Sequence, residues 1–399
     1  MNIGLICREL EFGGTERVAA RLSCLLSSQG FNVHIITQFQ PTPTEYKHQC
    51  VTRECVNEYG VWTVEDADRI VRKYDLQLVI LNGGWNGEWQ PSVFARFNKL
   101  GVRTVVILHH AFNNWLFSGA NAGDFSKENL LPYIDCIVCV DKIQALWWSR
   151  QHPRVVYIPN PVTTEPVKCE GVGKDPHGIV WVGRGDDWGK RLDLAIDVFK
   201  HVREVIADAT LTVVGALPRS GKVELPGVAC TGYVPDTCRY VKSASVNLVT
   251  TLWEVTVPQV VLEASALGVP TVAFDIPVLR GNEEIQTGKT VVDVAQLVLK
   301  ILQGHLFAID SKSAAKKVVD RNRAVAEQWL KLLSSLVVGD DQEFFLTQLN
   351  EYRTIECYEK LIDEIQRSDG YFVRAQLPLL EKVRYWQGRW SGLKRRIGL

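Results

Sequence analysis

The chain has 399 residues, 46% of them hydrophobic, and it carries 45 basic and 45 acidic side chains. A chain of this length can form two or three domains of about 150 residues, each with its own core. The zero net charge excludes the overall basic excess that nucleic-acid binding needs, so we expect no nucleic-acid partner. No apolar run reaches the roughly 18 to 20 residues that cross a bilayer.

The N-terminus and the cysteines indicate a reducing compartment. Residues 1–7 lack a basic region and a small-residue cleavage site, so we expect a first β-strand rather than a signal peptide. The ten cysteines are scattered, and although Cys136 and Cys139 have C-x-x-C spacing, no second pair lies at a zinc-ribbon distance. In a strand these two side chains would lie on opposite faces. We therefore expect reduced thiols and a cytoplasmic protein.

Apolar strand-like runs alternate with helical patterns along the first part of the chain. The clearest helical pattern covers residues 16–28. Several of the expected strands are nearly continuous runs of Val, Ile and Leu, as in strands that are covered on both faces. These strands are expected at residues 3–7, 33–37, 76–81, 104–108, 136–140 and 155–158. Such alternation is typical of a parallel, doubly wound sheet.

A second alternating series follows an irregular segment. Residues 161–177 hold three prolines and two glycines without periodicity and predict a linker. Further strands are expected at residues 179–183, 210–215, 246–250 and 271–274. The sequence therefore predicts two Rossmann-like domains, over residues 1–162 and 163–310, which face a cleft at the carboxyl ends of their strands.

The C-terminal part, residues 311–399, is predicted to be a helical extension. Its end has six basic residues and no acidic residue after Glu381, with aromatic side chains between them. A segment of this kind suits the anionic surface of a membrane, here the cytoplasmic face. The competing interpretation, which we favour, is a helix that packs on the domains and leaves its charges in solvent.

The segment 254–264 has the most informative pattern. Glu254 and Glu263 bracket an apolar run that suits one face of a short helix beginning near Pro258. Carboxylates so placed can accept hydrogen bonds from sugar hydroxyls, while the helix N-terminus faces an anion. The alternative is a surface loop with a solvated glutamate.

A pair of cations follows the predicted strand 178–183. Arg184 and Lys190 lie on a loop rich in Gly and Asp, just before a helical pattern. Two cations at a strand end and beside a helix start fit a clamp for a diphosphate. An exposed basic loop paired with Asp186 or Asp187 explains the segment equally well.

Polar and glycine residues also follow other predicted strands. Gly13 and Gly14 come after the first strand and open the first helix, where they permit close approach of the backbone to a phosphate or sugar. His109 directly follows the strand 104–108, and Tyr233 and Val234 follow a strand in the second domain. Together, in this order, the segments resemble the retaining glycosyltransferases of the GT-B fold, specifically glycosyltransferase family 4, over roughly residues 2–305.

The resemblance implies a nucleotide-sugar donor held mainly by the second domain and an acceptor on the first. At the phosphates and the ribose, it implies that Arg184 and Lys190 neutralise the diphosphate, that amides near Val257 bind phosphate and that Glu263 binds the ribose hydroxyls. Tyr233 and Val234 are implied to lie by the base. At the sugar, Glu254 is implied to face the donor sugar, His109 to line the sugar site, and Gly13 and Gly14 to approach the donor from the other domain. One departure concerns the two glutamates: eight residues separate Glu254 from Glu263, where the family pattern has seven.

The resemblance also implies a mechanism without a metal or other cofactor. Transfer would retain the anomeric configuration, and the leaving phosphate would take the proton of the acceptor hydroxyl. Asp186 and Asp187 are then expected to face solvent. UDP is the expected nucleotide from its frequency in the family, and the acceptor is a glycan or a lipid-linked glycan of surface polysaccharide or lipopolysaccharide synthesis. The alternatives are a nucleotide-sugar epimerase of the same fold and an inactive sugar-binding scaffold, which the displaced Glu254 would favour.

Overall fold

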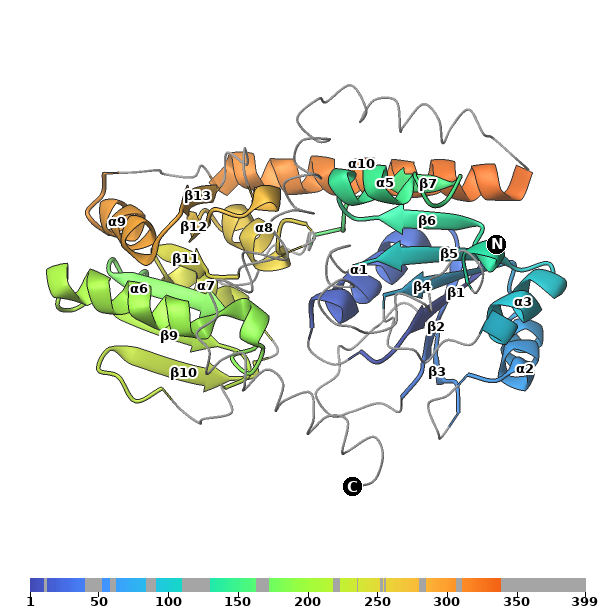
Figure 1. The fold of residues 1–399 in the computed structure, drawn as a ribbon, viewed down its shortest axis with the longest axis horizontal. Coiled ribbons are helices and arrows are strands. Elements are labelled where there is room, and N and C mark those ends of the chain that lie inside the picture. Colours follow the sequence, from blue (N-terminus) through green and yellow to red (C-terminus); the bar gives the residue numbers. More distant parts are fainter. Residues whose placement is uncertain are drawn as a thin grey trace.

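The computed structural model forms two lobes joined by a long helix (Figure 1). It describes residues 1–10, 13–39, 52–57, 62–83, 91–109, 130–162, 172–217, 223–234, 236–251, 254, 256–279, 285–305 and 311–338. Each lobe is a parallel sheet with helices on both faces, which confirms the predicted α/β class with two doubly wound sheets. The tail after residue 338, with the expected membrane contact, lies outside the described residues.

The sheet of the N-terminal lobe has the order β3-β2-β1-β4-β5-β6-β7, with all its strands parallel. Its strands are β1 (Asn2–Cys7), β2 (Asn32–Thr37), β3 (Thr52–Cys55), β4 (Leu78–Asn82), β5 (Arg103–Leu108), β6 (Cys136–Cys139) and β7 (Val155–Tyr157). The order reverses between β1 and β4, where Ile3 pairs with both Val33 and Leu78. Ligands bind at the carboxyl edge of such a switch point.

Two cores flank this sheet. One lies under α1 (Gly14–Ser28), and the other lies under α2 (Val64–Tyr74), α3 (Pro91–Lys99), the short helix η2 (Leu131–Tyr133) and α5 (Lys142–Trp148). Cys136 belongs to the first core and Cys139 to the second, as strand geometry predicts for side chains three residues apart. The described cysteines form no disulfide among themselves.

The sheet of the C-terminal lobe has the order β10-β9-β8-β11-β12-β13 and is also parallel. Its strands are β8 (Gly178–Val182), β9 (Thr210–Val214), β10 (Val228–Gly232), β11 (Val246–Val249), β12 (Thr271–Phe274) and β13 (Ile285–Gly288). Its helices are α6 (Leu192–Val205) and α9 (Val291–Leu302) on one face, α7 (Cys238–Ser243) and α8 (Gln259–Ala266) on the other, and the short η3 (Trp188–Lys190) and η4 (Pro277–Leu279). Here the order reverses between β8 and β11.

The last described helix, α10 (Ser311–Val338), runs along both lobes (Figure 1). Although it follows the second sheet in the chain, its side chains Trp329, Leu332 and Leu333 are buried in the core of the first. Asn322 connects this helix to the start of the linker through two hydrogen bonds. Its Nδ2 donates to the Val162 carbonyl at 2.6 Å, and its Oδ1 accepts from the Val162 amide at 2.9 Å. None of the described helices is long and apolar enough to cross a membrane.

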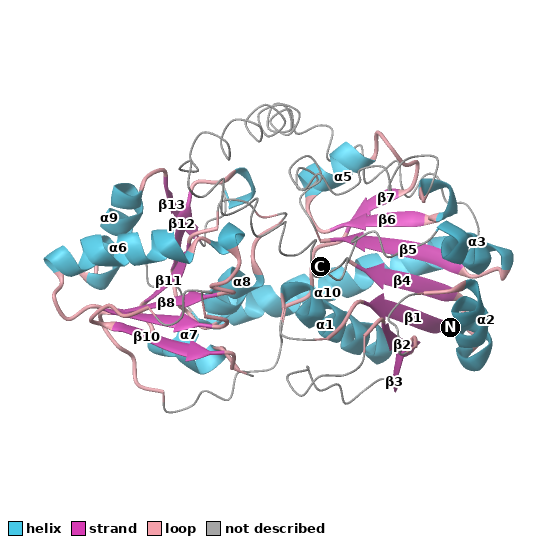
Figure 2. Cartoon of the chain, turned by 60° about the horizontal axis from the view of Figure 1, so that its bottom comes forward, coloured by secondary structure: helices cyan, strands magenta, loops and turns pink. Residues whose placement is uncertain are grey.

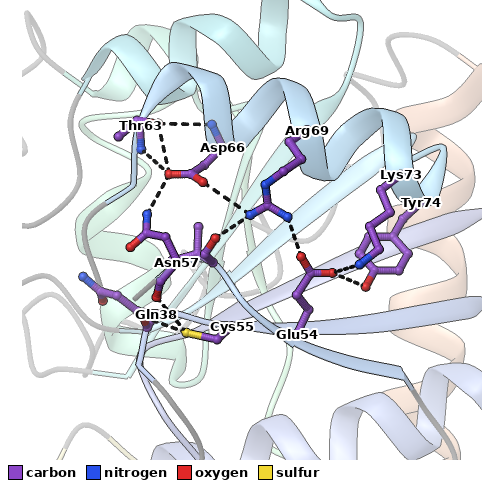
Figure 3. A network of polar contacts seen from close by, with 10 residues as sticks. Gln38, Glu54, Cys55, Asn57, Thr63, Asp66, Arg69, Lys73 and Tyr74 are labelled. Atoms are coloured by element: carbon purple, nitrogen blue, oxygen red, sulfur yellow. Dashed lines mark hydrogen bonds and ion pairs between the residues drawn. The ribbon is translucent and has the colours of Figure 1, made fainter. Parts of the chain in front are cut away.

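The edge strand β3 pairs with β2 and is linked to α2 by a network of polar side chains (Figure 3). Glu54 on β3 accepts hydrogen bonds from Arg69, Lys73 and Tyr74 of α2, with Tyr74 Oη at 2.5 Å. Burial raises the pKa of Glu54, but the hydrogen bonds from Lys73, Tyr74 and Arg69 outweigh it and lower the pKa to about 2. The strand was not predicted, since a polar edge strand lacks the Val, Ile and Leu run of a central one.

Candidate active site

The carboxyl edges of both sheets meet between the lobes, with α1 and α8 on their inner faces (Figure 2). α1 follows β1, and α8 follows β11, so each begins beside the switch point of its sheet. Most of the predicted site residues lie in the loops after β1, β5, β8, β10 and β11, or at the helix starts that follow them.

The loop after β8 is fixed by buried hydroxyl groups of the segment after β11. Trp181 Nε1 donates to Thr250 Oγ1 at 2.9 Å, and that hydroxyl lies 2.9 Å from the Lys190 carbonyl oxygen and 2.8 Å from the Arg191 carbonyl oxygen. Thr251 Oγ1 donates to the Gly189 carbonyl at 3.1 Å. These hydrogen bonds hold the backbone of Lys190 in place, and the Lys190 side chain is the part that can contact a ligand.

Lys190 contacts the carboxylate that was predicted to face the donor sugar. Its Nζ forms an ion pair with Glu254 Oε1, and the two side chains are 35% and 16% exposed. The structure thus brings together two predicted site residues that are 64 positions apart. Val255, which holds the position that the family spacing assigns to the first glutamate, lies outside the described residues.

Arg184 pairs with an aspartate of its own loop. Its Nη2 lies 2.5 Å from Asp187 Oδ2, and Asp187 Oδ1 also accepts from the Gly189 amide at 2.9 Å. Asp186 is exposed, whereas Asp187 is partly buried, with 25% of its side chain exposed beside Arg184. Burial lowers the pKa of Arg184, but the nearby Asp187, Asp186 and Tyr233 outweigh burial. The pKa is therefore raised overall, and the guanidinium stays charged.

Glu263 lies on α8, one turn after its start, and is 3% exposed. Its Oε1 accepts from Arg17 Nη1 and Arg21 Nη2, each at 2.7 Å, and its Oε2 accepts from Arg17 Nη1 at 2.9 Å. Both arginines come from α1 of the other lobe. Burial raises the pKa of Glu263, but Arg17 and Arg21 outweigh it, so the pKa is lowered and the carboxylate is charged. Sequence reasoning missed these two arginines.

The N-terminal lobe contributes an open backbone at the start of α1. A Cβ at Gly14 would have no described atom within 4 Å, whereas a Cβ at Gly13 would lie 2.0 Å from Glu16 Oε2. The space beside Gly13 is thus taken by the partly buried Glu16 side chain, whereas the space beside Gly14 holds no described atom and leaves room for a ligand. Burial is the main cause of the raised pKa of Glu16.

His109 is oriented by an asparagine that the sequence reasoning missed. Its Nε2 lies 2.9 Å from Asn82 Oδ1, and Asn82 Nδ2 donates to the Thr15 carbonyl at 2.9 Å. This chain joins the ends of β5 and β4 to the first turn of α1. A polar residue directly after the apolar run Leu78–Leu81, at the carboxyl end of a strand, was the signal for Asn82.

Three other predicted positions are Tyr233 and Val234, in the loop after β10, and Val257, just before α8. Gly215 has φ +123°, and a Cβ there would lie 2.0 Å from the Gly183 carbonyl oxygen, so the loops after β8 and β9 pack backbone to backbone. Beside them, Tyr233 is 51% exposed, and Val234 is partly buried against the core. The Val257 side chain packs against a core cluster, which leaves its backbone for the predicted phosphate contact.

The structure tests the placement of these residues rather than their roles, which stay predictions. In the described ranges, no group of three or more His, Cys, Asp or Glu side chains is arranged to hold a metal ion. The segments 110–129 and 280–284 lie outside those ranges.

Comparisons with known proteins agree with this architecture. Residues 12–166 match the family described as Glycosyltransferase Family 4, and residues 176–304 match Glycosyl transferases group 1. Among the curated proteins, none matches this sequence.

Solved structures similar to this one include glycosyltransferases. TarM of S. aureus, in complex with fondaparinux, α-GlcNAc-glycerol and UDP, is 13% identical with a TM-score of 0.65, and the match covers 84% of this chain and 100% of that one. The pneumococcal O-GlcNAc transferase GtfA, with UDP and GlcNAc, is 11% identical with a TM-score of 0.62, at 84% and 99% coverage. HepE of Anabaena, with UDP and glucose, is 13% identical with a TM-score of 0.62, also at 84% and 99%.

These identities show a shared fold, and the two family matches add the sequence evidence. The chain belongs to the GT-B glycosyltransferases, with a family 4 N-terminal part and a group 1 C-terminal part.

Proposed function

We propose that this protein is a retaining, metal-independent glycosyltransferase that moves a sugar from a nucleoside-diphosphate sugar to a hydroxyl of a glycan or lipid-linked acceptor. The observation that carries the proposal is the anchored loop after β8, which holds Arg184 and Lys190 at the switch point of the second sheet, with Glu254 against Lys190. UDP is the proposed nucleotide, because the structures of TarM, GtfA and HepE contain it.

The cations act on the leaving group. As the glycosidic bond to the donor breaks, the diphosphate gains negative charge, and Arg184 and Lys190 stabilise it where it develops. Before the donor binds, Asp187 and Glu254 neutralise these cations, so the phosphates replace carboxylates as their partners. The leaving phosphate then takes the proton of the acceptor hydroxyl, and no protein nucleophile is needed.

The roles of the other residues follow from their positions. Gly14 leaves open space beside the start of α1, and His109 is held by Asn82 at the end of β5. We assign both to the sugar side of the site. Glu263, on α8, is assigned to the ribose.

The test replaces Lys190 by Ala and measures kcat with the donor saturating. Loss of one group that stabilises developing charge typically lowers the rate by about 10²- to 10³-fold. The matched control is Lys200→Ala, because Lys200 is exposed on α6 and pairs with Asp197 of the same helix. Turnover of Lys190→Ala close to that of the control would refute the assignment.

Analysis of the products, with and without an acceptor, separates the alternative functions. An epimerase would produce isomers of the UDP-sugar without any acceptor, and a binding scaffold would neither transfer nor hydrolyse the donor. The anomeric configuration of the product, read by NMR, decides between retention and inversion.

We also propose a cytoplasmic location and a role in surface polysaccharide or lipopolysaccharide synthesis, which rest on the family resemblance. Contact of the basic tail with an anionic membrane is a separate proposal, supported by the charges after Glu381. Flotation with anionic liposomes, with and without residues 380–399, tests it; equal flotation would rule it out.

A further inference from the structure

The inner helices of the two lobes meet through matched polar faces. Arg17 and Arg21 are four residues apart and therefore lie on the same face of α1, and Gln259 and Glu263 lie in the same way on α8. Arg21 donates through Nη1 to Gln259 Oε1 and through Nη2 to Glu263 Oε1. Figure 2 shows these helices side by side between the lobes.

Glu263 is buried in this contact, and the other three polar side chains are partly buried. Arg17 and Arg21 are 21% and 16% exposed, and Glu263 is 3% exposed. Removing the partner of a buried charge is strongly destabilising, because the remaining charge is left without compensation. Two arginines rather than one bind Glu263, and together they keep its buried carboxylate charged.

The hydrogen bonds also set which oxygen of Glu263 is available. Each carboxylate oxygen accepts about two hydrogen bonds. Oε1 already accepts from Arg17 and Arg21, whereas Oε2, in the described part of the chain, accepts only a shared bond from Arg17 Nη1. Oε2 therefore keeps acceptor capacity, and the two arginines fix its orientation.

We propose that Arg17 and Arg21 are positioning residues that hold the Glu263 carboxylate so that Oε2 accepts a hydrogen bond from a ribose hydroxyl of the nucleotide. This inference rests on the proposed function, in which Glu263 receives the ribose. On this proposal, the C-terminal lobe holds the nucleotide, but recognition of its ribose also depends on two arginines of the N-terminal lobe.

The experiment measures how well the protein distinguishes a ribonucleotide from a deoxynucleotide. Dissociation constants of UDP and of its 2′-deoxy and 3′-deoxy analogues are measured by calorimetry, with the GDP series in parallel. A hydrogen bond to a charged group corresponds to about 10- to 150-fold in affinity. We expect the wild type to prefer the ribonucleotide over at least one analogue by about tenfold or more.

The same ratio is then measured for Arg17→Met/Arg21→Met and for Glu263→Gln. We expect it to fall below about threefold in both, because neither variant presents a charged, oriented carboxylate to the ribose. If the double variant does not fold, Arg17→Met alone decides, since Arg17 provides the described bond to Oε2.

The control is Asn322→Ala, which removes the side-chain hydrogen bonds between α10 and Val162 and leaves the four polar side chains of the α1–α8 contact unchanged. A positioning role predicts that this variant keeps the wild-type ratio. The inference is overturned if the arginine variants keep the wild-type ratio, or if Asn322→Ala lowers it equally. Failure of the wild type to bind either nucleotide series would instead refute the proposed function, and the inference with it.

Discussion

Replacing Trp329 by Ala removes the largest side chain that α10 places in the core of the N-terminal lobe. Trp329 is 2% exposed and packs with residues of β1, β5 and α1 in one cluster. A buried tryptophan covers roughly 200 to 250 Å², which at about 25 cal/mol per Å² sets an upper limit near 6 kcal/mol. Measured Trp→Ala changes in cores cost about 3 to 5 kcal/mol in free energy of unfolding.

That loss translates into a measurable shift in melting temperature. For a unit of 150 to 250 residues, about 1 kcal/mol corresponds to roughly 2 to 4 °C, so we expect the transition of the N-terminal lobe to fall by about 6 to 20 °C in differential scanning calorimetry. Glu327→Ala is the matched control, because Glu327 is exposed two residues away on the same helix. Trp329→Phe should recover part of the loss.

The result that would refute this reasoning is specific. If Trp329→Ala melts within about 2 °C of Glu327→Ala, α10 does not complete the core of the N-terminal lobe, whatever its place in the structure.

Three further predictions concern other parts of the molecule. Glu54 has a lowered pKa of about 2, so its carboxylate stabilises the folded state at pH values above its ordinary pKa. Glu54→Gln should therefore reduce the free energy of unfolding by up to about 3 kcal/mol at pH 7, measured by denaturant titration. The difference in this free energy between wild type and variant should shrink as the pH falls from about 4.5 towards 2. A difference that does not change with pH would contradict this. Gly215→Ala should cost about 2 to 5 kcal/mol in thermal unfolding through its positive φ and its clash with Gly183, whereas Gly304→Ala, at a positive φ in open space, should cost less. Transferase activity should survive excess EDTA; complete loss that Mg²⁺ restores would show a metal requirement.

Much of the fold could be predicted from the sequence because most strands are central and apolar. β4 and β5 are covered on both faces, and their runs of Val, Ile and Leu mark them. The short strands β3 and β13 were missed, since both lie at sheet edges, where polar side chains are tolerated.

The site could be predicted only in part, for a related reason. Strand ends and glycine-rich turns mark Arg184, Lys190 and Gly14, because these features are local in sequence. The partners of these groups are not local: Arg17 and Glu263 are 246 positions apart. On an amphipathic helix such as α1, Arg17 and Arg21 lie on the polar side, which periodicity alone assigns to solvent.

The path of α10 has a consequence for how the lobes can move. The polypeptide crosses from one lobe to the other twice, once after Val162 and once along α10, which starts beside α8 and then packs its second half on the core of the lobe where the chain began. A hinge with two parallel covalent tethers restricts relative rotation to an axis near both crossings and opposes twisting about other axes. For the same reason, a fragment cut at residue 162 would lack the α10 side chains that cover one side of its own core.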